Sequence, residues 1–478
     1  MSKKPNAMYV MSGGGTVVVS ASVYKLIHKI YTEYRDRIGT FFAAVGGMRG
    51  AVYEDLTDVF QYVIGDKYVR GDGNANAVSR LNQIKFYATP TFGTSRYNPK
   101  EEDLERMLNV FSVHNIHYLF LNGGNDSMLK ARRIAQYAKE RDYELYVTAI
   151  PKTVDNDLLV THRCPGYASF AKQVVITTMS LEADVDSFAI PKYAANSGRI
   201  KEGAVAQVVV FMGRDQGWGA AASILGKLYD SYGPHVILTK EGGFNISKFL
   251  DKCQNAWDNY GKLLVVASEG VHDGTTYVAN YLDISSSLSG LKFKEHTDSF
   301  KNTSVTDSRL ASFLKILLEN KLNIPTEIYK DFKCREEGPS YLERNNLEIL
   351  SAVDFRDAIA VGEKAADLAF GKSSPISEVM VTLTPKPGEA NYTLLENVAD
   401  PTKGSKAMTK SIRSLDTPER LILSPDGMMI NRGSFMDYIS DFIDLNGPNR
   451  SELLRGEGFR LPLAKIDWPL EERLLPHY

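Results

Sequence analysis

The sequence has little cysteine and no long apolar run, and each shortage argues against a class of protein. Only three cysteines occur in 478 residues, Cys164, Cys253 and Cys334, and none forms a C-x-x-C pair. Scattered thiols argue against a disulfide framework and are typical of a reducing, cytoplasmic setting. No apolar stretch approaches the length of a membrane span, and no signal peptide is recognisable. We expect a cytoplasmic protein with no membrane contact.

Net charge is also small, because 56 Lys and Arg residues oppose 58 Asp and Glu residues, for a formal charge of −2. Such a balance gives no overall attraction to nucleic acid or acidic lipid. Any phosphate site must therefore depend on locally placed Arg and Lys side chains. A hydrophobic content of 43% is ordinary for a globular protein, and the length allows more than one domain.

Short apolar runs alternate with longer amphipathic stretches through residues 1–270. The apolar runs predict strands at Met8–Met11, Thr40–Val45, Ile116–Leu121, Leu145–Ile150, Ala204–Phe211, His235–Leu238 and Leu263–Ala267. The amphipathic stretches predict helices at Ser20–Tyr34, Glu101–His114, Ser127–Arg141, Tyr167–Val185, Ala220–Tyr229 and Ile246–Tyr260. The alternation predicts an α/β protein with two mostly parallel, doubly wound sheets. Residues 271–300 predict a long loop or insertion, and residues 375–478 give mixed signals.

Polar side chains cluster where two of the predicted strands end. Residues 151–157 read Pro-Lys-Thr-Val-Asp-Asn-Asp, so two carboxylates, a hydroxyl, an amide and an ammonium follow one strand. Residues 122–127 read Asn-Gly-Gly-Asn-Asp-Ser and lead from another strand into a helix. Open α/β sheets place their chemistry at such carboxyl ends, and a Gly-Gly turn at a helix start offers N–H groups to phosphate. Together the two turns suggest phosphoryl transfer, with a carboxylate of the second turn as the candidate base.

Further turns occupy the same position in the predicted sheets. Ser12–Thr16 carries three glycines after the first strand, and it is either a phosphate cradle or a plain turn that needs a positive φ. Met212–Arg214 and Glu241 follow later strands and place an Arg and a Glu at the same rim. A purely structural alternative is that the polar residues in these turns act only as helix and turn caps.

These motifs resemble those of the phosphofructokinase family, and more narrowly those of its long, pyrophosphate-dependent branch. The closest likeness is in Gly123–Ser127, Pro151–Asp157 and Met212–Arg214, and the resemblance runs from Ser12 to about Tyr438, with low specificity after Phe370. Further matches are Gly93–Arg96, Lys240–Phe244, the series Arg335, Tyr341 and Arg344, and the series Asn431, Phe435 and Tyr438.

The resemblance implies two Rossmann-like lobes with the active site in the cleft between them. Residues 1–165 and about 343–398 would form the lobe that binds the donor phosphate. Residues 166–342 and about 399–478 would form the lobe that binds the acceptor sugar. Because relatives complete the sugar site with residues of a second subunit, the resemblance also implies a homodimer or homotetramer.

The resemblance further implies a role for each matching residue. Asp155 would be the general base toward the acceptor hydroxyl, and the other catalytic residues would be Lys152, Thr153 and Arg214. Pyrophosphate would be held by Gly13, Gly14, Arg96, Gly124, Asp126 and Lys152. The acceptor, fructose 6-phosphate or a related sugar phosphate, would be held by Thr153, Asp157, Met212, Gly213, Arg214, Glu241, Arg335, Tyr341 and Arg344. The cofactor would be Mg²⁺, bound by Asn125 and Asp126.

Two positions bear on the choice of donor. Relatives that use ATP usually have Gly where this chain has Asp126, and a carboxylate there would repel the α-phosphate of a nucleotide. At ~4 Å and an effective dielectric constant of ~20, that repulsion is about 4 kcal/mol per charge pair. Lys152 stands where many ATP users have Gly, and it could pair with pyrophosphate.

Three departures from the family pattern affect the site but leave Asp155 intact. Asn125 replaces a magnesium-binding Asp and brings no charge, the loop Gly15–Ser20 is altered, and Val205 replaces a phosphate-binding Arg or Lys. A diverged enzyme is therefore the favoured hypothesis, and an inactive regulatory homologue that binds phosphorylated ligands is the second. A dinucleotide-dependent oxidoreductase is disfavoured, because no G-x-G-x-x-G follows the first strand.

Overall fold

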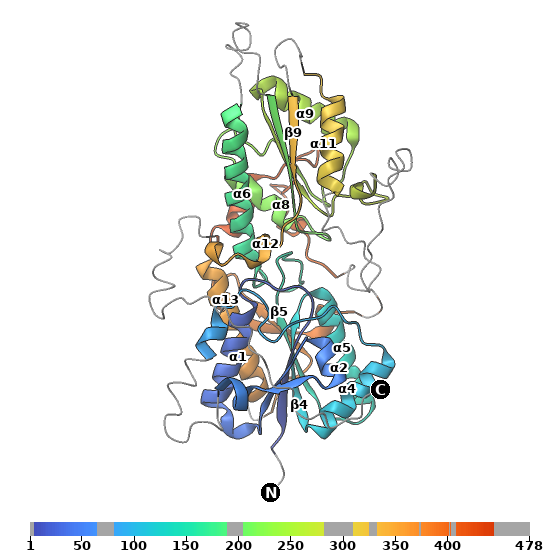
Figure 1. The fold of residues 1–478 in the computed structure, drawn as a ribbon, viewed down its shortest axis with the longest axis vertical. Helices are drawn as coiled ribbons and strands as arrows, with labels where there is room; N and C mark the ends of the chain where they lie inside the picture. Colours follow the sequence, from blue (N-terminus) through green and yellow to red (C-terminus); the bar gives the residue numbers. More distant parts are fainter. Residues whose placement is uncertain are drawn as a thin grey trace.

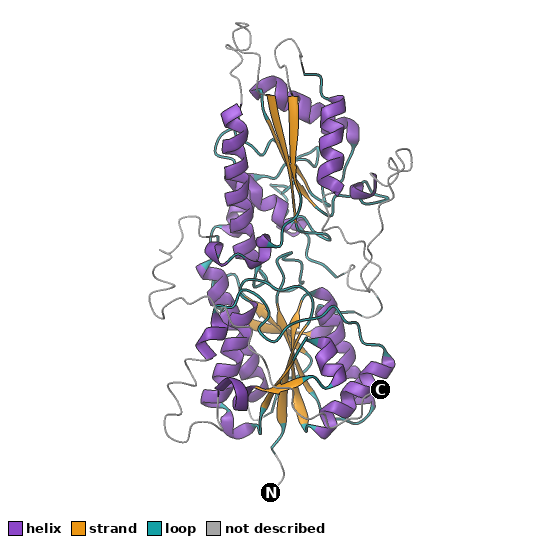
Figure 2. Cartoon of the chain, in the orientation of Figure 1, coloured by secondary structure: helices purple, strands orange, loops and turns teal. Residues whose placement is uncertain are grey.

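The structure, a computed structural model, describes residues 4–64, 81–188, 204–281, 309–324, 332–371, 374–400, 402 and 408–443. Two lobes, each built on its own β-sheet, follow one another along the long axis of the molecule (Figures 1 and 2). In the described residues the larger sheet has seven strands in the order β11-β10-β5-β4-β1-β2-β3, and the smaller has four in the order β7-β8-β6-β9. The predicted α/β fold with parallel sheets is confirmed.

The larger sheet forms the core of the first lobe. Its strands are β1 (Asn6–Met11), β2 (Phe41–Ala44), β3 (Leu56–Asp58), β4 (Ile116–Gly123), β5 (Tyr146–Pro151), β10 (Val379–Leu383) and β11 (Ala390–Leu394). The five inner strands are parallel, whereas β3 and β11 are antiparallel edge strands. One face packs against helices α1 (Val19–Glu33) and α13 (Ala352–Phe370). The other face packs against α2 (Met48–Tyr53), α4 (Glu101–Val113) and α5 (Asn125–Glu140) (Figure 1).

The smaller sheet forms the core of the second lobe, and all its strands are parallel. They are β6 (Ala204–Phe211), β7 (Val236–Leu238), β8 (Leu263–Ser268) and β9 (Phe332–Glu337). One face packs against α6 (Tyr167–Phe188), α8 (Trp218–Ala222) and α14 (Arg432–Ile439), and the other against α9 (Ile246–Tyr260) and α11 (Arg309–Lys321). The sheets thus assign α13, β10 and β11 to the first lobe and α14 to the second. The predicted residue boundaries of the lobes stay a prediction.

The remaining regular segments are short. They are the helix α12 (Leu342–Asn345), the π-helical turn Phe60–Ile64, and the 3₁₀ turns Arg35–Arg37, Ser223–Gly226, Val278–Asn280, Leu347–Ile349, Leu395–Asn397 and Ile412–Leu415. Of the predicted insertion, residues 271–281 form a tight turn, and residues 282–300 lie outside the described residues. Within the described part of the chain, none of the helices combines the length and the apolar character that crossing a bilayer requires.

The seven predicted strands are all present, and five of the six predicted helices occur close to their expected bounds. The helix predicted at Ala220–Tyr229 is wrong, because α8 ends at Ala222 and a single 3₁₀ turn continues only to Gly226. The Lys227 ammonium then donates to the carbonyls of Asp230 (3.0 Å), Tyr232 and Pro234 (3.4 Å). These bonds fold the backbone into a loop where the amphipathic pattern predicts a further helical turn.

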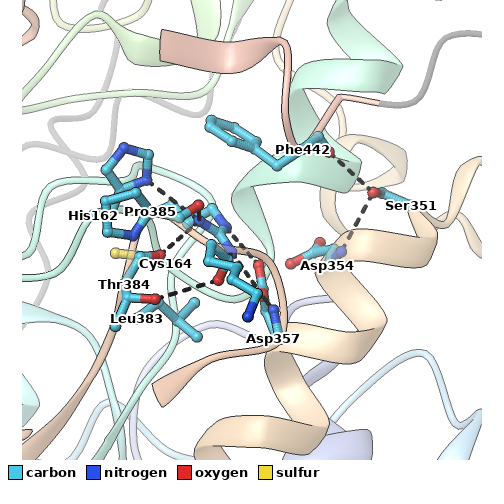
Figure 3. Close-up of polar contacts among 12 residues, drawn as sticks. His162, Cys164, Ser351, Asp354, Asp357, Leu383, Thr384, Pro385 and Phe442 are labelled. Carbon is cyan, nitrogen blue, oxygen red and sulfur yellow. Dashed lines mark hydrogen bonds and ion pairs between the residues drawn. The ribbon is translucent and has the colours of Figure 1, made fainter. Parts of the chain in front are cut away.

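A buried ion pair joins three segments of the first lobe that are far apart in sequence. The guanidinium of Arg163 forms two hydrogen bonds with Asp357 of α13, at 2.6 and 2.8 Å. It also donates to the carbonyls of Thr384 (2.9 Å) and Pro385 (3.0 Å), which follow β10 (Figure 3). The backbone N–H of Gly388 completes the carboxylate's shell at 2.7 Å. Both charged groups of this pair therefore have hydrogen-bond partners, and their bonds connect the segment after β5 to α13 and to the β10–β11 turn.

The same helix also connects the two lobes. Asp354 of α13 accepts hydrogen bonds from the backbone N–H groups of Gly166 (2.7 Å) and Ser169 (3.1 Å), at the start of α6. A carboxylate suits that position, because the first N–H groups of a helix have no partner within it. Ser351 caps α13 itself and donates to the carbonyl of Phe442 in the C-terminal segment (3.3 Å) (Figure 3). A first-lobe helix therefore sets the position of the long second-lobe helix.

Asp357→Ala should lower the free energy of unfolding by about 3–5 kcal/mol, because it leaves the Arg163 guanidinium buried without its counter-ion. Chemical denaturation followed by circular dichroism measures this loss. The matched control is Glu389→Ala, which removes the partner of Lys386 in an exposed pair and should cost less than about 1 kcal/mol. Equal effects of the two substitutions would contradict the role given to Arg163.

Candidate active site

The carboxyl ends of both sheets carry the predicted functional turns. In the larger sheet β1 lies between β2 and β4, so the strand order reverses there, and the glycine turns after β1 and β4 meet at that point. In the smaller sheet β6 lies between β8 and β9, and Met212–Arg214 follows β6. Reversals of strand order open crevices in which α/β proteins bind ligands. The site is therefore built from the loops of both sheets.

The glycine turn after β1 brings two cationic groups against the backbone. Gly13 has a φ of +85°, and a Cβ atom at this residue would lie 3.3 Å from Lys152 Nζ. A Cβ atom on Gly14 would lie 2.5 Å from an Arg344 guanidinium nitrogen. Any larger residue would push at least one of these cations away. The absence of side chains thus allows an ammonium and a guanidinium from distant segments to lie beside the same turn.

The altered part of this loop does not face the cations. Thr16, Val17 and Val18 are buried, and the side chain of Thr16 packs against Gly166. Ser20 lies within α1 and donates to the carbonyl of Thr89 at 2.6 Å. The unusual residues after Gly15 therefore serve the packing at the start of α1, and the turn that contacts Lys152 and Arg344 keeps its glycines.

The segment Lys152–Asp157, called the Asp155 loop below, leaves β5 and enters the interior between the lobes. The backbone N–H of Asp155 is bonded to Thr153 Oγ1 (3.1 Å). The Asp155 carboxylate is partly exposed, and within the described residues no hydrogen bond or ion pair occupies it. Burial raises the pKa of Asp155, and the nearby Arg214 guanidinium opposes that shift. A carboxylate that is unpaired and more basic than usual is suited to accept a proton from a ligand.

Lys152 is the cation next to this carboxylate. It is 5% exposed, and burial lowers its pKa to about 8, although the charge of Asp155 opposes the shift. The charges of Arg344 and Arg96 also disfavour the protonated form. Three cationic side chains thus lie close enough to repel one another, and the Asp155 carboxylate offsets only part of that repulsion. A bound anion would stabilise such a cluster further.

Asn125 and Asp157 lie together on the first-lobe side of the loop. The Asn125 amide nitrogen donates to Asp157 Oδ2 at 2.6 Å, and in the described residues its Oδ1 atom is buried without a partner. Burial, together with the charges of Asp155 and Asp215, raises the pKa of Asp157 to about 8. An unpaired amide oxygen beside a half-buried Asp126 fits Mg²⁺, which typically takes one or two protein oxygens and completes its shell with phosphate and water.

The turn after β6 is held by two buried carboxyl groups. Glu343 accepts a hydrogen bond from the backbone N–H of Met212 (2.8 Å), and Glu269 accepts one from Gly213 (3.3 Å). The Arg214 guanidinium bonds Asp215 at 3.3 Å. All three predicted acceptor residues of this turn, Met212, Gly213 and Arg214, therefore lie at the rim near Asp155, and Arg214 already has an anionic neighbour.

Four predicted site residues have other surroundings. Arg335 lies within β9, is paired with Asp184 of α6, and covers the ring of Phe188. Both oxygens of Glu241 accept the backbone N–H of Gly217, and one of them also accepts Ser411 Oγ and the N–H of Ile412. Tyr341 is 59% exposed and lies 4.8 Å from the Arg344 guanidinium, and Arg96 is exposed. Within one chain, Arg335 is thus separate from the cluster around Asp155.

Three charged residues of the site were not predicted. Glu343 and Glu269 have been described, and the third, Lys130 of α5, donates to Ser12 Oγ (3.2 Å) and to the Tyr97 carbonyl (3.0 Å). Burial raises the pKa of Glu269 to about 8 and lowers that of Lys130 to about 8. A signal existed for Glu269, which follows the end of a predicted strand within a few residues, as Asp155 does. Lys130 lies in a helix interior and carried no such signal.

Residues 6–314 match the family described as Phosphofructokinase, which is more than half of the chain. The chain therefore belongs to the phosphofructokinase family. The resemblance seen in the motifs is confirmed, including the narrower likeness to pyrophosphate-dependent members.

Three similar proteins have names that describe pyrophosphate-dependent enzymes. The chain is 31% identical over 370 residues to the pyrophosphate–fructose 6-phosphate 1-phosphotransferase of Halomonas elongata, covering 76% of this chain and 77% of that protein. It is 32% identical over 389 residues to the enzyme of the same name from Methylococcus capsulatus, covering 80% and 81%. The crystal structure of a pyrophosphate-dependent phosphofructokinase from Nitrosospira multiformis superposes with a TM-score of 0.72 at 25% identity, covering 99% of each chain.

Glu269→Gln should make stability less sensitive to pH. The raised pKa means that folded Glu269 keeps its proton between pH of about 4.5 and 8 while the unfolded chain loses it, so the wild-type free energy of unfolding falls as pH rises through this window. Glutamine does not titrate. Within this window, the free energy of unfolding of the variant should therefore rise relative to that of the wild type by about 1.4 kcal/mol per pH unit. Denaturation curves at several pH values measure the difference, and a constant difference would mean that Glu269 is ionised in the folded protein.

Proposed function

We propose that this protein transfers a phosphoryl group from pyrophosphate to the 1-hydroxyl of fructose 6-phosphate, in the cytoplasm, as the composition predicts. Membership of the phosphofructokinase family and the names of its relatives support this activity. The observation that carries the proposal is the Asp155 carboxylate. It is unpaired within the described residues, and the charges of Lys152 on the proposed donor side and of Arg214 on the proposed acceptor side both act on it.

In this mechanism Asp155 accepts the proton of the acceptor hydroxyl while the hydroxyl oxygen attacks a phosphorus atom of pyrophosphate. The bond to the bridging oxygen breaks, and orthophosphate leaves with the charge that the attacking alcohol has supplied. Lys152, Arg344 and the backbone N–H of Gly14 would hold the transferred group and the departing one, whereas the N–H of Gly13 already donates to the carbonyl of Ser95 at 3.1 Å. Phosphoryl transfer depends mainly on such positioning and on positive charge.

Two features support pyrophosphate over a nucleotide. Asp126 lies in the first turn of α5, directly after the Gly-Gly turn, and its charge would repel the additional phosphate of ATP. Lys152, Arg344 and Arg96 offer a small diphosphate three cations within range of one another. A bound Mg²⁺ would be held by Asn125 Oδ1 and Asp126, where it would neutralise phosphate oxygens as the charge moves between them.

A regulatory homologue that binds phosphorylated ligands without turning them over is the second candidate. Two observations favour it: the neutral Asn125 stands at the expected metal position, and Arg214 is bonded to Asp215. In that case the cation cluster would still bind a phosphate, but the Asp155 carboxylate would have no role. The two functions therefore differ in what the loss of Asp155 does.

An activity panel of the purified protein with Mg²⁺ should give turnover with pyrophosphate and fructose 6-phosphate and none with ATP or ADP. Asp155→Asn removes the base and should lower kcat by ~10²–10⁴ while the affinity for either substrate hardly changes. Calorimetric titration with each substrate measures that affinity. The control is Asp437→Asn, at an exposed carboxylate paired with Arg420, which should behave as wild type. Unchanged kcat in Asp155→Asn, or pyrophosphate binding without turnover in the wild type, would favour the regulatory homologue or another base.

We also propose that two copies of the chain associate through α6. Ile176 and Met179 are each 39% exposed on this helix, and Phe188 at its end is 41% exposed. Tyr341 and Leu342, beside the acceptor rim, are exposed as well. A second copy seated here would cover these apolar side chains, and it could bring a cationic group to the sugar phosphate in place of the absent one at Val205.

Light scattering should therefore give at least twice the monomer mass for the wild type. Ile176→Glu should reduce that mass, because it buries a charge without a counter-ion in the contact. Ile316→Glu is the matched control, since Ile316 is 47% exposed on α11, on the opposite face of the smaller sheet. A monomeric wild type, or equal behaviour of the two variants, would contradict this contact.

A further inference from the structure

The C-terminal segment places a partly buried lysine directly behind the Asp155 loop. Lys410 follows the second-lobe strands by many residues, and the segment it begins packs on the second lobe through Ile412 and Ile422. Its side chain nevertheless turns toward the first lobe. The ammonium donates to the carbonyls of Thr161 (3.1 Å) and His162 (2.8 Å).

The third partner of this ammonium is the residue next to the candidate base. Lys410 Nζ donates to Asn156 Oδ1 at 3.3 Å, and the same oxygen accepts the backbone N–H of Cys164 at 3.0 Å. The amide nitrogen of Asn156 donates to the hydroxyl of Tyr438, also in the C-terminal segment, at 2.7 Å. Asn156 is fully buried and has a φ of +54°, a conformation that needs support from its surroundings.

The main chain of the segment reinforces the contact. The backbone N–H of Lys410 donates to the carbonyl of Asp157 at 2.8 Å, and the Trp218 indole donates to the carbonyl of Lys410 at 2.8 Å. Tyr438 in turn donates to the His162 carbonyl at 2.8 Å. The last two residues of the Asp155 loop, and Thr161 and His162 after it, are therefore bonded to one segment that packs on the other lobe.

The surroundings of the Lys410 ammonium indicate a role other than stabilising the fold. In the described part of the chain Lys410 has no ion-pair partner, and its charge rests on carbonyl and amide oxygens and on the Trp218 ring at 5.1 Å. Burying an ammonium without a carboxylate partner costs free energy that an apolar side chain of the same size would avoid. A donor with three directed bonds can, however, fix the shape of a loop as an apolar group cannot.

We propose that Lys410 is a positioning residue of the phosphotransfer reaction, which holds Asn156 and thereby sets the place of the adjacent Asp155 carboxylate. The inference rests on the proposed function, because it takes the Asp155 loop to act in the phosphoryl transfer. Lys410 would touch neither donor nor acceptor. Its loss should therefore appear in the rate of the chemical step and in the order of the loop, with little change in substrate affinity.

The test compares Lys410→Met, Lys410→Arg and the exposed control Lys386→Met in the full-length protein. In Lys410→Met, kcat should fall on the order of 10–100-fold, since a shift of about 1 Å in a catalytic group costs up to ~10². The KM values and the calorimetric affinity for pyrophosphate should stay near those of wild type. Lys410→Arg keeps the charge and the donors and should recover part of the loss, whereas Lys386→Met should have no effect.

A second measurement does not depend on activity. Hydrogen exchange of the backbone amides in residues 152–164 should accelerate in Lys410→Met and should not in Lys386→Met. If Lys410→Met does not fold, Tyr438→Phe removes the hydroxyl that bonds Asn156 and the His162 carbonyl, leaves the three bonds of Lys410 in place, and should show both effects in weaker form. Wild-type kcat with unchanged exchange would overturn the inference. Accelerated exchange in a protein that is inactive with every donor would instead overturn the proposed function and leave the support of the loop in place.

Discussion

The buried pair between Arg163 and Asp357 is the interaction on which the rest of the structure depends. It lies directly behind the segment that returns from the Asp155 loop, and it ties that segment to α13 and to the β10–β11 turn. Three residues earlier on α13, Asp354 fixes the start of α6. The position of the second lobe and the shape of the Asp155 loop thus depend on the same helix, α13.

The site combines groups whose protonation is displaced by burial and by their neighbours. Asp155, Asp157 and Glu269 are all less acidic than usual, while Lys152 is less basic. Each shift follows from taking like charges out of water in one small region. A substrate that brings two phosphates and a metal ion would restore the missing counter-charges, so binding and the ionisation of the loop are coupled.

The features that could be predicted from the sequence are those that depend on the residue types within a short segment. The parallel strands were recognisable because they are buried on both faces and so are continuously apolar, and the turns after β4 and β5 stood out by their chemistry. β9 was missed because an edge strand with the sequence Phe-Lys-Cys-Arg-Glu-Glu shows no apolar run. The surroundings of Arg335, Glu241 and Lys410 were inaccessible to the same reasoning, because their partners at Asp184, Gly217 and Asn156 are brought together only by the fold.

The first lobe is discontinuous along the chain, and this has a consequence for biosynthesis. Strands β1 to β5 are made first, but α13, β10 and β11, which cover one face and extend the sheet beyond β5, leave the ribosome only after the whole smaller sheet has been made. Until then, the part of the apolar face that α13 later covers stays open to water and to other chains. The edge of β5, which later pairs with β10, is open as well. The lobe whose strands are made first therefore cannot complete its sheet until every strand of the smaller sheet has been made.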